Sequence, residues 1–306
     1  FRVLFHSLKV ANFILQFAFF FDIIRLNRKE VIMDPIQLIT FLKEILPDEI
    51  QKKLIEPTAN SLGNTLGDAV EVMSAPVSIP LKYLSGYVKD IKSKIDYKFS
   101  TYSKSEIEYE NIDLNKILKY SNDLSYSLDS EEIRNIFANL ITKSFIKNDK
   151  YSLHPAFSAI VSELSPLDAR NLAIIYETYP KGSFAIVDYK AVSPNGSFNI
   201  LKYNVFLENT SETNLDVQSL SIENLERLKL VKIEEKFKWD QSTYDKFMAT
   251  SFYLETEHGY KKMKESWDSA GYPKEEIETW VSELTLVKKT CELSSLGKLF
   301  CEICFN

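Results

Sequence analysis

The stretch HPAFSAIVSELSPLDARNLAIIYE, residues 154–177, has the clearest local punctuation in the chain. Its first part repeats apolar residues at helical spacing, and Ser165 then begins a second helix as its N-cap, with an acidic residue three positions later. A proline occupies the first helical position, where its missing N–H costs nothing. We therefore predict a helix, a break and a second helix, with a structural hinge made of His154, Pro155, Ser165, Pro166 and Asp168. His154 is expected to cap the first helix or to make a buried hydrogen bond.

The residues after this hinge follow the order of a winged-helix module. Residues 184–190 and 197–207 are rich in β-branched and aromatic residues and flank a Pro-Asn-Gly turn, which predicts a hairpin. Helical spacing returns over 219–231, with leucines at positions 220, 225, 228 and 230, as the second helix of a helix-turn-helix. Strands at 231–235 and 284–294 would form the wing, with an aromatic-rich insertion at about 237–283 between them. A last helix closes the chain at 294–305.

The residues before the hinge are mostly helical by pattern. Residues 34–57 predict two short amphipathic helices broken at Pro47. Residues 107–150 predict further helix, in which Ser130 caps an apolar face that begins at Ile133. The predicted fold is thus mainly α, with a helical domain at 33–164 and a winged-helix-like α+β domain at 165–306.

Residues 1–32 differ from the rest of the chain. They contain an apolar run, residues 11–21, that is too short to span a bilayer comfortably, and no methionine precedes Met33. Lys29-Glu30-Val31 is what a bacterial ribosome-binding sequence would encode in frame. We expect these residues to be a translated leader, and a membrane anchor is the alternative.

A stripe of small residues, Ala59, Gly63 and Gly67, has a spacing of four. Such a stripe lets a second backbone approach closely in membranes or in soluble helix pairs. Because polar residues surround it, we expect packing inside the protein or in an oligomer.

The next segment, residues 81–104, predicts a helix with a narrow apolar seam at positions 81, 84, 88, 91 and 95. Several lysines flank this seam, among them Lys82, Lys89, Lys92 and Lys94. The seam could pack against a partner helix while the lysines stay solvated, or the helix could lie on an anionic membrane. The first interpretation is preferred.

The overall charge and the motif content limit the chemistry. With 37 basic and 43 acidic residues, the net charge of −6 gives no general attraction to nucleic acid. The predicted recognition helix offers only Arg227 and Lys229 against two glutamates. Cys301 and Cys304 form a C-x-x-C without a second pair, so core packing is expected and not zinc, and three cysteines suit a cytoplasmic protein. No nucleotide-binding, hydrolase or metalloprotease motif occurs, and we predict no catalytic residue, cofactor or metal.

Four stretches together resemble a known family. They are EPTANSLGNTLGDAVEVMSAPVSIPLKYL (56–84), SEEIRNIFANLITKSF (130–145), HPAFSAIVSELSPLDARNL (154–172), and the pair ENLERLKLV (223–231) and ELSSLGKLFCEIC (292–304). The chain resembles the abortive infection alpha family of bacterial proteins. It departs from that family at 111–124, which lacks the expected prolines, and in its long insertion. The resemblance implies a role in defence against bacteriophage and supplies no catalytic residues.

Two functional hypotheses follow. The first is a non-enzymatic anti-phage protein, cytoplasmic or membrane-associated, that acts through helix packing with a protein partner or another copy of itself, or through membrane contact. The alternative is a winged-helix regulator that binds nucleic acid. The acidic C-terminal half favours the first.

Overall fold

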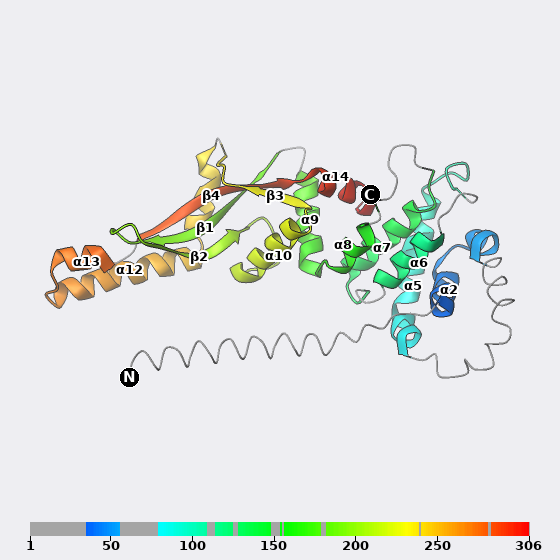
Figure 1. Cartoon of the computed structure of the whole chain (residues 1–306), viewed down its shortest axis with the longest axis horizontal. Helices are drawn as coiled ribbons and strands as arrows, with labels where there is room; N and C mark the ends of the chain where they lie inside the picture. The colour runs from blue at the N-terminus through cyan, green and yellow to red at the C-terminus, as the bar shows by residue number, and fades with distance from the viewer. Residues whose placement is uncertain are drawn as a thin grey trace.

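The chain is elongated, with an all-helical part at one end and, at the other, a β-sheet flanked by further helices (Figure 1). The computed structural model describes residues 35–55, 79–108, 114–124, 128–147, 154, 156–178, 182–238, 240–280 and 283–305. Three groups of predictions lie outside these residues: the leader at 1–32, the stripe Ala59, Gly63 and Gly67, and Pro155.

The helical end begins with α2 (Pro35–Ile45), followed by α3 (Asp48–Ile50), which continues into a π-helical turn, η1 (Gln51–Ile55). The predicted break at Pro47 is confirmed, because this residue has an extended ψ of 145° and precedes the new helix. The next two helices are α5 (Ile79–Ser100) and α6 (Leu114–Leu124). Helix α2 packs on both of them, and Phe41, Leu42 and Ile45 are fully buried there.

Helix α7 (Glu131–Lys143) is the central helix of this end and contacts α5, α6 and the short helix α8 (Phe157–Ser162). The predicted Ser130 cap is confirmed, since its hydroxyl accepts a hydrogen bond from the Ile133 N–H. Glu131 and Glu132 follow in the first turn, where a carboxylate favours the positive end of the helix dipole. Its predicted apolar face is buried, as expected for a core helix.

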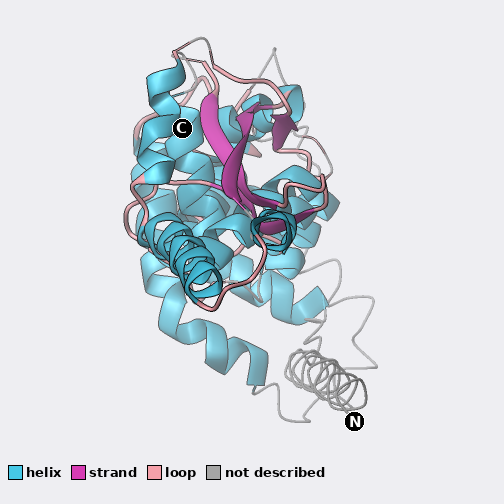
Figure 2. Ribbon diagram, turned by 90° about the vertical axis from the view of Figure 1, so that its left-hand side faces the viewer, coloured by secondary structure: helices cyan, strands magenta, loops and turns pink. Residues whose placement is uncertain are grey.

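The C-terminal half begins with α9 (Pro166–Thr178), the hairpin strands β1 (Phe184–Val192) and β2 (Phe198–Val205), and α10 (Leu215–Arg227). The chain then forms β3 (Val231–Glu234), η4 (Gln241–Tyr244), α11 (Asp245–Met248), α12 (Ser251–Ser269) and α13 (Lys274–Trp280). Strand β4 (Glu283–Leu293) and helix α14 (Ser295–Cys304) complete it. The four strands form one antiparallel sheet in the order β2-β1-β4-β3, which Figure 2 shows from its end.

Both predicted strand pairs are present. The Pro-Asn-Gly turn closes the β1–β2 hairpin, with Gly196 at a φ of 86°. Strands β3 and β4 pair across the whole insertion, with Val231 opposite Leu293. The mainly helical fold with a small sheet is therefore confirmed, whereas the winged-helix assignment stays a prediction.

The hairpin contains an irregularity that a buried carboxylate explains. The register of β1 and β2 shifts between Val187 and Lys190. There Asp188 accepts a hydrogen bond from the Asn204 N–H at 2.8 Å and pairs with Lys289 of β4 at 2.7 Å. Both charged side chains are largely buried, so each neutralises the charge of the other. This pair and the hydrogen bond to Asn204 hold the bulge in place.

The insertion covers one face of the sheet. Ala185, Val187 and Tyr189 of β1 form a second core with Tyr244 and Phe247. On this face the Tyr189 ring stacks on Phe252 of α12, with centroids 5.2 Å apart. The opposite face, with Phe184 and Ile186, belongs to the main core. Farther along, α12 and α13 extend beyond the hairpin turn (Figure 1), and no residue of α12 is fully buried.

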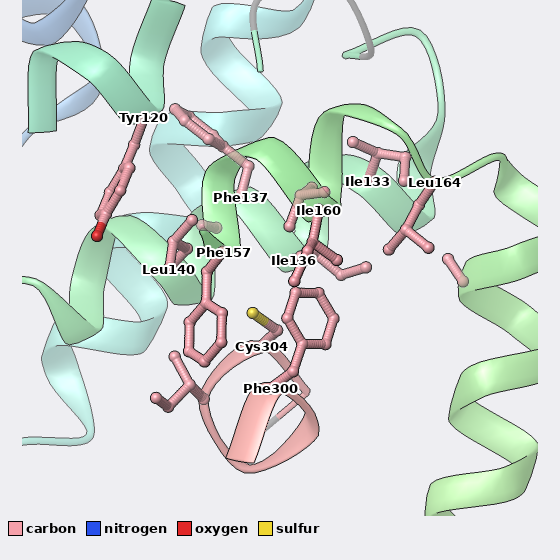
Figure 3. Close-up of a cluster of buried hydrophobic side chains, with 14 of the residues drawn as sticks. Tyr120, Ile133, Ile136, Phe137, Leu140, Phe157, Ile160, Leu164, Phe300 and Cys304 are labelled. Atoms are coloured by element: carbon pink, nitrogen blue, oxygen red, sulfur yellow. The ribbon is translucent and has the colours of Figure 1, made fainter. Parts of the chain in front are cut away.

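Helix α14 joins the sheet to the helical end. Phe300 of α14 meets Phe157 of α8 edge to face, and the Asn139 amide of α7 donates to the Cys304 carbonyl at 2.7 Å. Figure 3 shows Phe157, Phe300 and Cys304 beside Ile136 and Leu140 of α7. One continuous core thus crosses the predicted domain boundary between residues 164 and 165, although that boundary itself stays a prediction.

On the other side of α14, Gly297 packs tightly against the Leu230 carbonyl, which precedes β3. A methyl group on Gly297 would lie 1.9 Å from that backbone oxygen. We expect Gly297→Ala to lower the free energy of unfolding by about 1–3 kcal/mol, the usual effect of overpacking, because backbone must move. Urea unfolding measures this change.

Gly259→Ala is the matched control, because a methyl group there meets nothing within 4 Å on exposed α12. It should raise the free energy of unfolding by up to about 1 kcal/mol, since alanine favours helix over glycine. Equal stability of the two variants would contradict the close packing of α14 on Leu230.

Candidate protein-interaction cleft at the α8–α9 break

The predicted hinge forms a capping box. The Ser165 hydroxyl accepts from the Asp168 N–H at 3.1 Å, and the Asp168 carboxylate accepts from the Ser165 N–H at 2.7 Å. Pro166 is the first residue of α9, as predicted. The two bonds satisfy backbone donors that the start of a helix leaves without partners. The break between α8 and α9 is therefore held by its own local sequence.

Asp168 also fastens a second helix. Its side chain is 2% exposed and accepts a further hydrogen bond from the Asn224 amide of α10 at 2.8 Å. The same amide donates to the Glu163 carbonyl at 3.1 Å. One buried carboxylate thus joins the hinge to α10.

A buried polar network continues this contact along α9 and α10. The Asn171 amide donates to Gln218 and to Ser221, both at 2.9 Å, and its carbonyl oxygen accepts from Asn209 at 2.6 Å. Gln218 in turn donates to the Asn209 backbone carbonyl. Because every bond here has a defined direction, the network sets the position of α10 on α9 more narrowly than apolar packing would.

His154 lies at the start of α8 and is exposed. Its Nδ1 accepts from the Ala156 N–H at 3.2 Å, whereas Ala156 is the N-cap residue of α8 and the helix has no side-chain cap. His154 therefore makes neither the predicted cap nor the predicted buried hydrogen bond. The ring also packs near Phe157, with centroids 5.7 Å apart.

A cleft of about 940 Å³ opens beside the hinge. Its inner surface contains the buried Ile133, Leu164 and Leu167. Val217 and Leu220 of α10 form one wall, and they are 41% and 67% exposed. The polar lining residues are Asp129, Ser130, Ser162, Glu163, Ser165, Asp168, Arg170, Ser221 and Asn224. Three residues of the predicted hinge, Ser165, Pro166 and Asp168, therefore line the cleft, and His154 does not. The sequence pattern identifies Leu220 only as an apolar position of a helix.

Two ion pairs bridge helices at the rim. Arg170 of α9 donates to Glu132 of α7 at 2.6 Å, and Arg227 of α10 donates to Glu163 at 2.6 Å. Partial burial opposes ionisation of Glu132, but hydrogen bonds from Ser130 and Arg170 hold its pKa below the usual value. The carboxylates of Glu132 and Glu163 thus form ion pairs that connect neighbouring helices.

The lysine-bearing helix α5 contributes no described residue to the lining of this cleft, although it packs on α7. Its described seam is buried inside the chain at Ile91 and Ile95, where α5 packs against α2 and α7. Lys92 pairs with Asp96, and Lys94 pairs with Asp90 and Glu131. Lys89 is exposed, and the side chain of Lys82 lies outside the described residues.

The cysteines lie in the core. Cys291, Cys301 and Cys304 are all buried and free. Burial raises the pKa of the Cys291 thiol to about 12 and raises those of the other two. Within the described residues no group of three or more potential metal ligands occurs, and no helix is long and apolar enough to cross a membrane.

These features define a mainly helical protein with a small antiparallel sheet and an open cleft that is lined in part by Ser165, Pro166 and Asp168. The family model of abortive infection alpha matches residues 85–304. The chain therefore belongs to this family, and the resemblance is confirmed, although the stretch at 56–84 lies before the matched residues. Comparison with curated proteins and with solved structures gives no significant match.

Asp168→Asn tests the joint between the hinge and α10. Both hydrogen bonds reach the same carboxylate oxygen, Oδ2, so the amide can keep an acceptor there but loses the negative charge that strengthens both bonds. We expect the free energy of unfolding to fall by about 1–2 kcal/mol, the difference between charge-assisted and neutral hydrogen bonds. Asp129→Asn, at an exposed position, should change it by less than about 0.5 kcal/mol. Thermal or urea unfolding distinguishes them, and a neutral Asp168→Asn would refute the joint.

The thiols provide a separate test of the packing of α14. Thiolate is the reactive form, and burial both blocks access to these thiols and raises their pKa values. At about pH 8 the folded protein should react with an aromatic disulfide reagent far more slowly than the protein in guanidinium chloride, where all three thiols react. A full equivalent of fast-reacting thiol in the folded protein would show that the C-terminal helix is open.

Proposed function

We propose that this protein acts in abortive infection as a non-enzymatic protein that binds a partner through the cleft beside the α8–α9 break. The observation that carries the proposal is the exposed apolar pair Val217 and Leu220 on the cleft wall. Exposed apolar side chains beside an apolar floor mark surfaces that other proteins cover.

The polar groups of the cleft support a binding role. Asp168 accepts from Ser165 and Asn224, and Glu163 pairs with Arg227. These bonds position three helices around the cleft. A rigid site of this kind reduces the entropy that a partner loses on binding.

The winged-helix likeness is part of this proposal, with α10 in the place of the recognition helix. A nucleic-acid role would need basic side chains that reach phosphates. Arg227 instead donates to Glu163 and Asn224, and Lys229 lies beyond the end of α10. We propose that the module contacts protein, and that nucleic-acid binding is the less favoured alternative.

The position of the lysines bears on membrane contact. Lys92 and Lys94 of α5 are engaged in ion pairs within the chain, which leaves Lys89 as the exposed lysine of that group with a described side chain. An anionic surface attracts clusters of free basic residues. We therefore place the protein in the cytoplasm, bound to a protein partner, and rank membrane contact lower.

Leu220→Asp should abolish protection against phage. The change puts a charge on the cleft wall and, at a residue that is 67% exposed, leaves the fold unchanged. A loss of about 1.4 kcal/mol of binding free energy raises the Kd for the partner tenfold, and the bound fraction falls by the same factor when the partner concentration is below Kd. The measurement is the plating efficiency of phage on cells that express each variant at equal level.

Leu254→Asp is the control, because Leu254 is also an exposed leucine, 52% accessible, on a different helix, α12. It should protect as the parent does. Full protection by a folded Leu220→Asp protein would remove the cleft from the function.

A further inference from the structure

We infer that the occupant of the cleft is a basic amphipathic helix of another protein. The inference deepens the proposed function and rests on it. It draws on the shape of the apolar wall, the charges of the lining and the groups at the two helix starts that border the cleft.

The apolar wall fits a helix. Val217 and Leu220 lie three positions apart on α10 and so form a ridge along one helix face. The cleft is also lined by Ile133 in the first turn of α7 and by Leu164 and Leu167. A groove bounded by helices accepts apolar anchors at spacings of three, four and seven residues from a docked helix. A volume of about 940 Å³ holds several such side chains.

The charge of the lining selects a basic partner. The lining holds three carboxylates, Asp129, Glu163 and Asp168, against one guanidinium, Arg170. Arg170 is already paired with Glu132, and Glu163 is paired with Arg227. The exposed carboxylate of Asp129 makes no ion pair with any residue that the structure describes. Lysine or arginine beside the apolar anchors would meet this charge.

The two helix starts do not reverse this preference. The N-termini of α7 and α9 border the cleft, and a bare helix start attracts anions. At α7, however, Ser130 accepts from a backbone N–H, and Glu131 and Glu132 occupy the first turn. At α9, Ser165 and Asp168 form the capping box. An acidic partner would therefore meet carboxylates at both helix starts.

A second copy of this chain fits less well than a basic partner. Two clefts that face each other would bring like-charged linings together. The net charge of −6 adds a general repulsion between copies. Self-association through the cleft is therefore treated as a competing outcome of the test.

The test uses the full chain and two synthetic peptides as probes. Both are about 18 residues long, five helical turns, with leucine on one face. One carries lysine on its polar face and the other glutamate. Fluorescence anisotropy of labelled peptide gives Kd for the parent, Leu220→Asp, Leu254→Asp, Asp129→Asn and Asp268→Asn. Asp268 is exposed on α12 and is the charge control.

We expect the lysine peptide to bind the parent at least about tenfold more tightly than the glutamate peptide, the factor that about 1.4 kcal/mol gives. Leu220→Asp should weaken the lysine peptide about tenfold or more, because the loss of a buried apolar anchor outweighs the attraction of one exposed carboxylate for lysine, and Leu254→Asp should not. Asp129→Asn should weaken it more than Asp268→Asn does, with the difference shrinking at about 1 M salt, where screening is strong.

Equal binding of the two peptides, or equal effects of Leu220→Asp and Leu254→Asp, overturns the inference. A parent dimer in light scattering that Leu220→Asp dissociates overturns it too, because the occupant is then a second copy. These results are separable from failure of the proposed function. If Leu220→Asp loses phage protection while the peptides fail, the cleft works but takes a different occupant.

Discussion

The arrangement of the chain around its cleft depends on one buried carboxylate, Asp168. It accepts from the Ser165 N–H and from the Asn224 amide, so it belongs at once to the start of α9 and to the contact with α10. A buried carboxylate is stable only when charge-assisted hydrogen bonds replace water, and these two bonds do that. Because both donors are fixed to helices, the charge also fixes the angle between them. Helix α10 is thereby held next to the break between α8 and α9, where its residues line the cleft.

The sequence predicts the local half of this arrangement and not the distant half. Ser165, Pro166 and Asp168 predict the helix start, since the residues of a capping box lie within four positions of the sequence. Asn224 lies 56 positions after Asp168, and Gln218 lies 47 after Asn171. Nothing in their local pattern marks them as partners, because an amide in a helix usually faces water. Leu220 is missed for a related reason: helical periodicity identifies an apolar position but does not tell whether another element covers it.

The aromatic residues of the insertion between β3 and β4 are another case in which the sequence shows the residues but not their contacts. These aromatic residues are visible in the sequence, yet their purpose depends on the sheet they cover. Tyr244, Phe247 and Phe252 lie on the face of β1 that carries Val187 and Tyr189, so both faces of the central strand are buried. An antiparallel sheet commonly leaves one face in water, and here the chain supplies its own cover. The family assignment identifies the chain as an abortive infection alpha protein without explaining this layer.

The cleft also connects the two ends of the molecule. One wall comes from α7, in the helical end, and the other from α10, which packs on β2 and α9. The Arg170–Glu132 pair joins α9 to α7, and α14 joins the same two ends through Phe157 and Asn139. A partner that binds both walls stabilises the joined arrangement by its own binding free energy, and by linkage any change that separates the walls weakens the partner. The position of the cleft at this junction therefore matters to the proposed partner binding as much as its chemistry does.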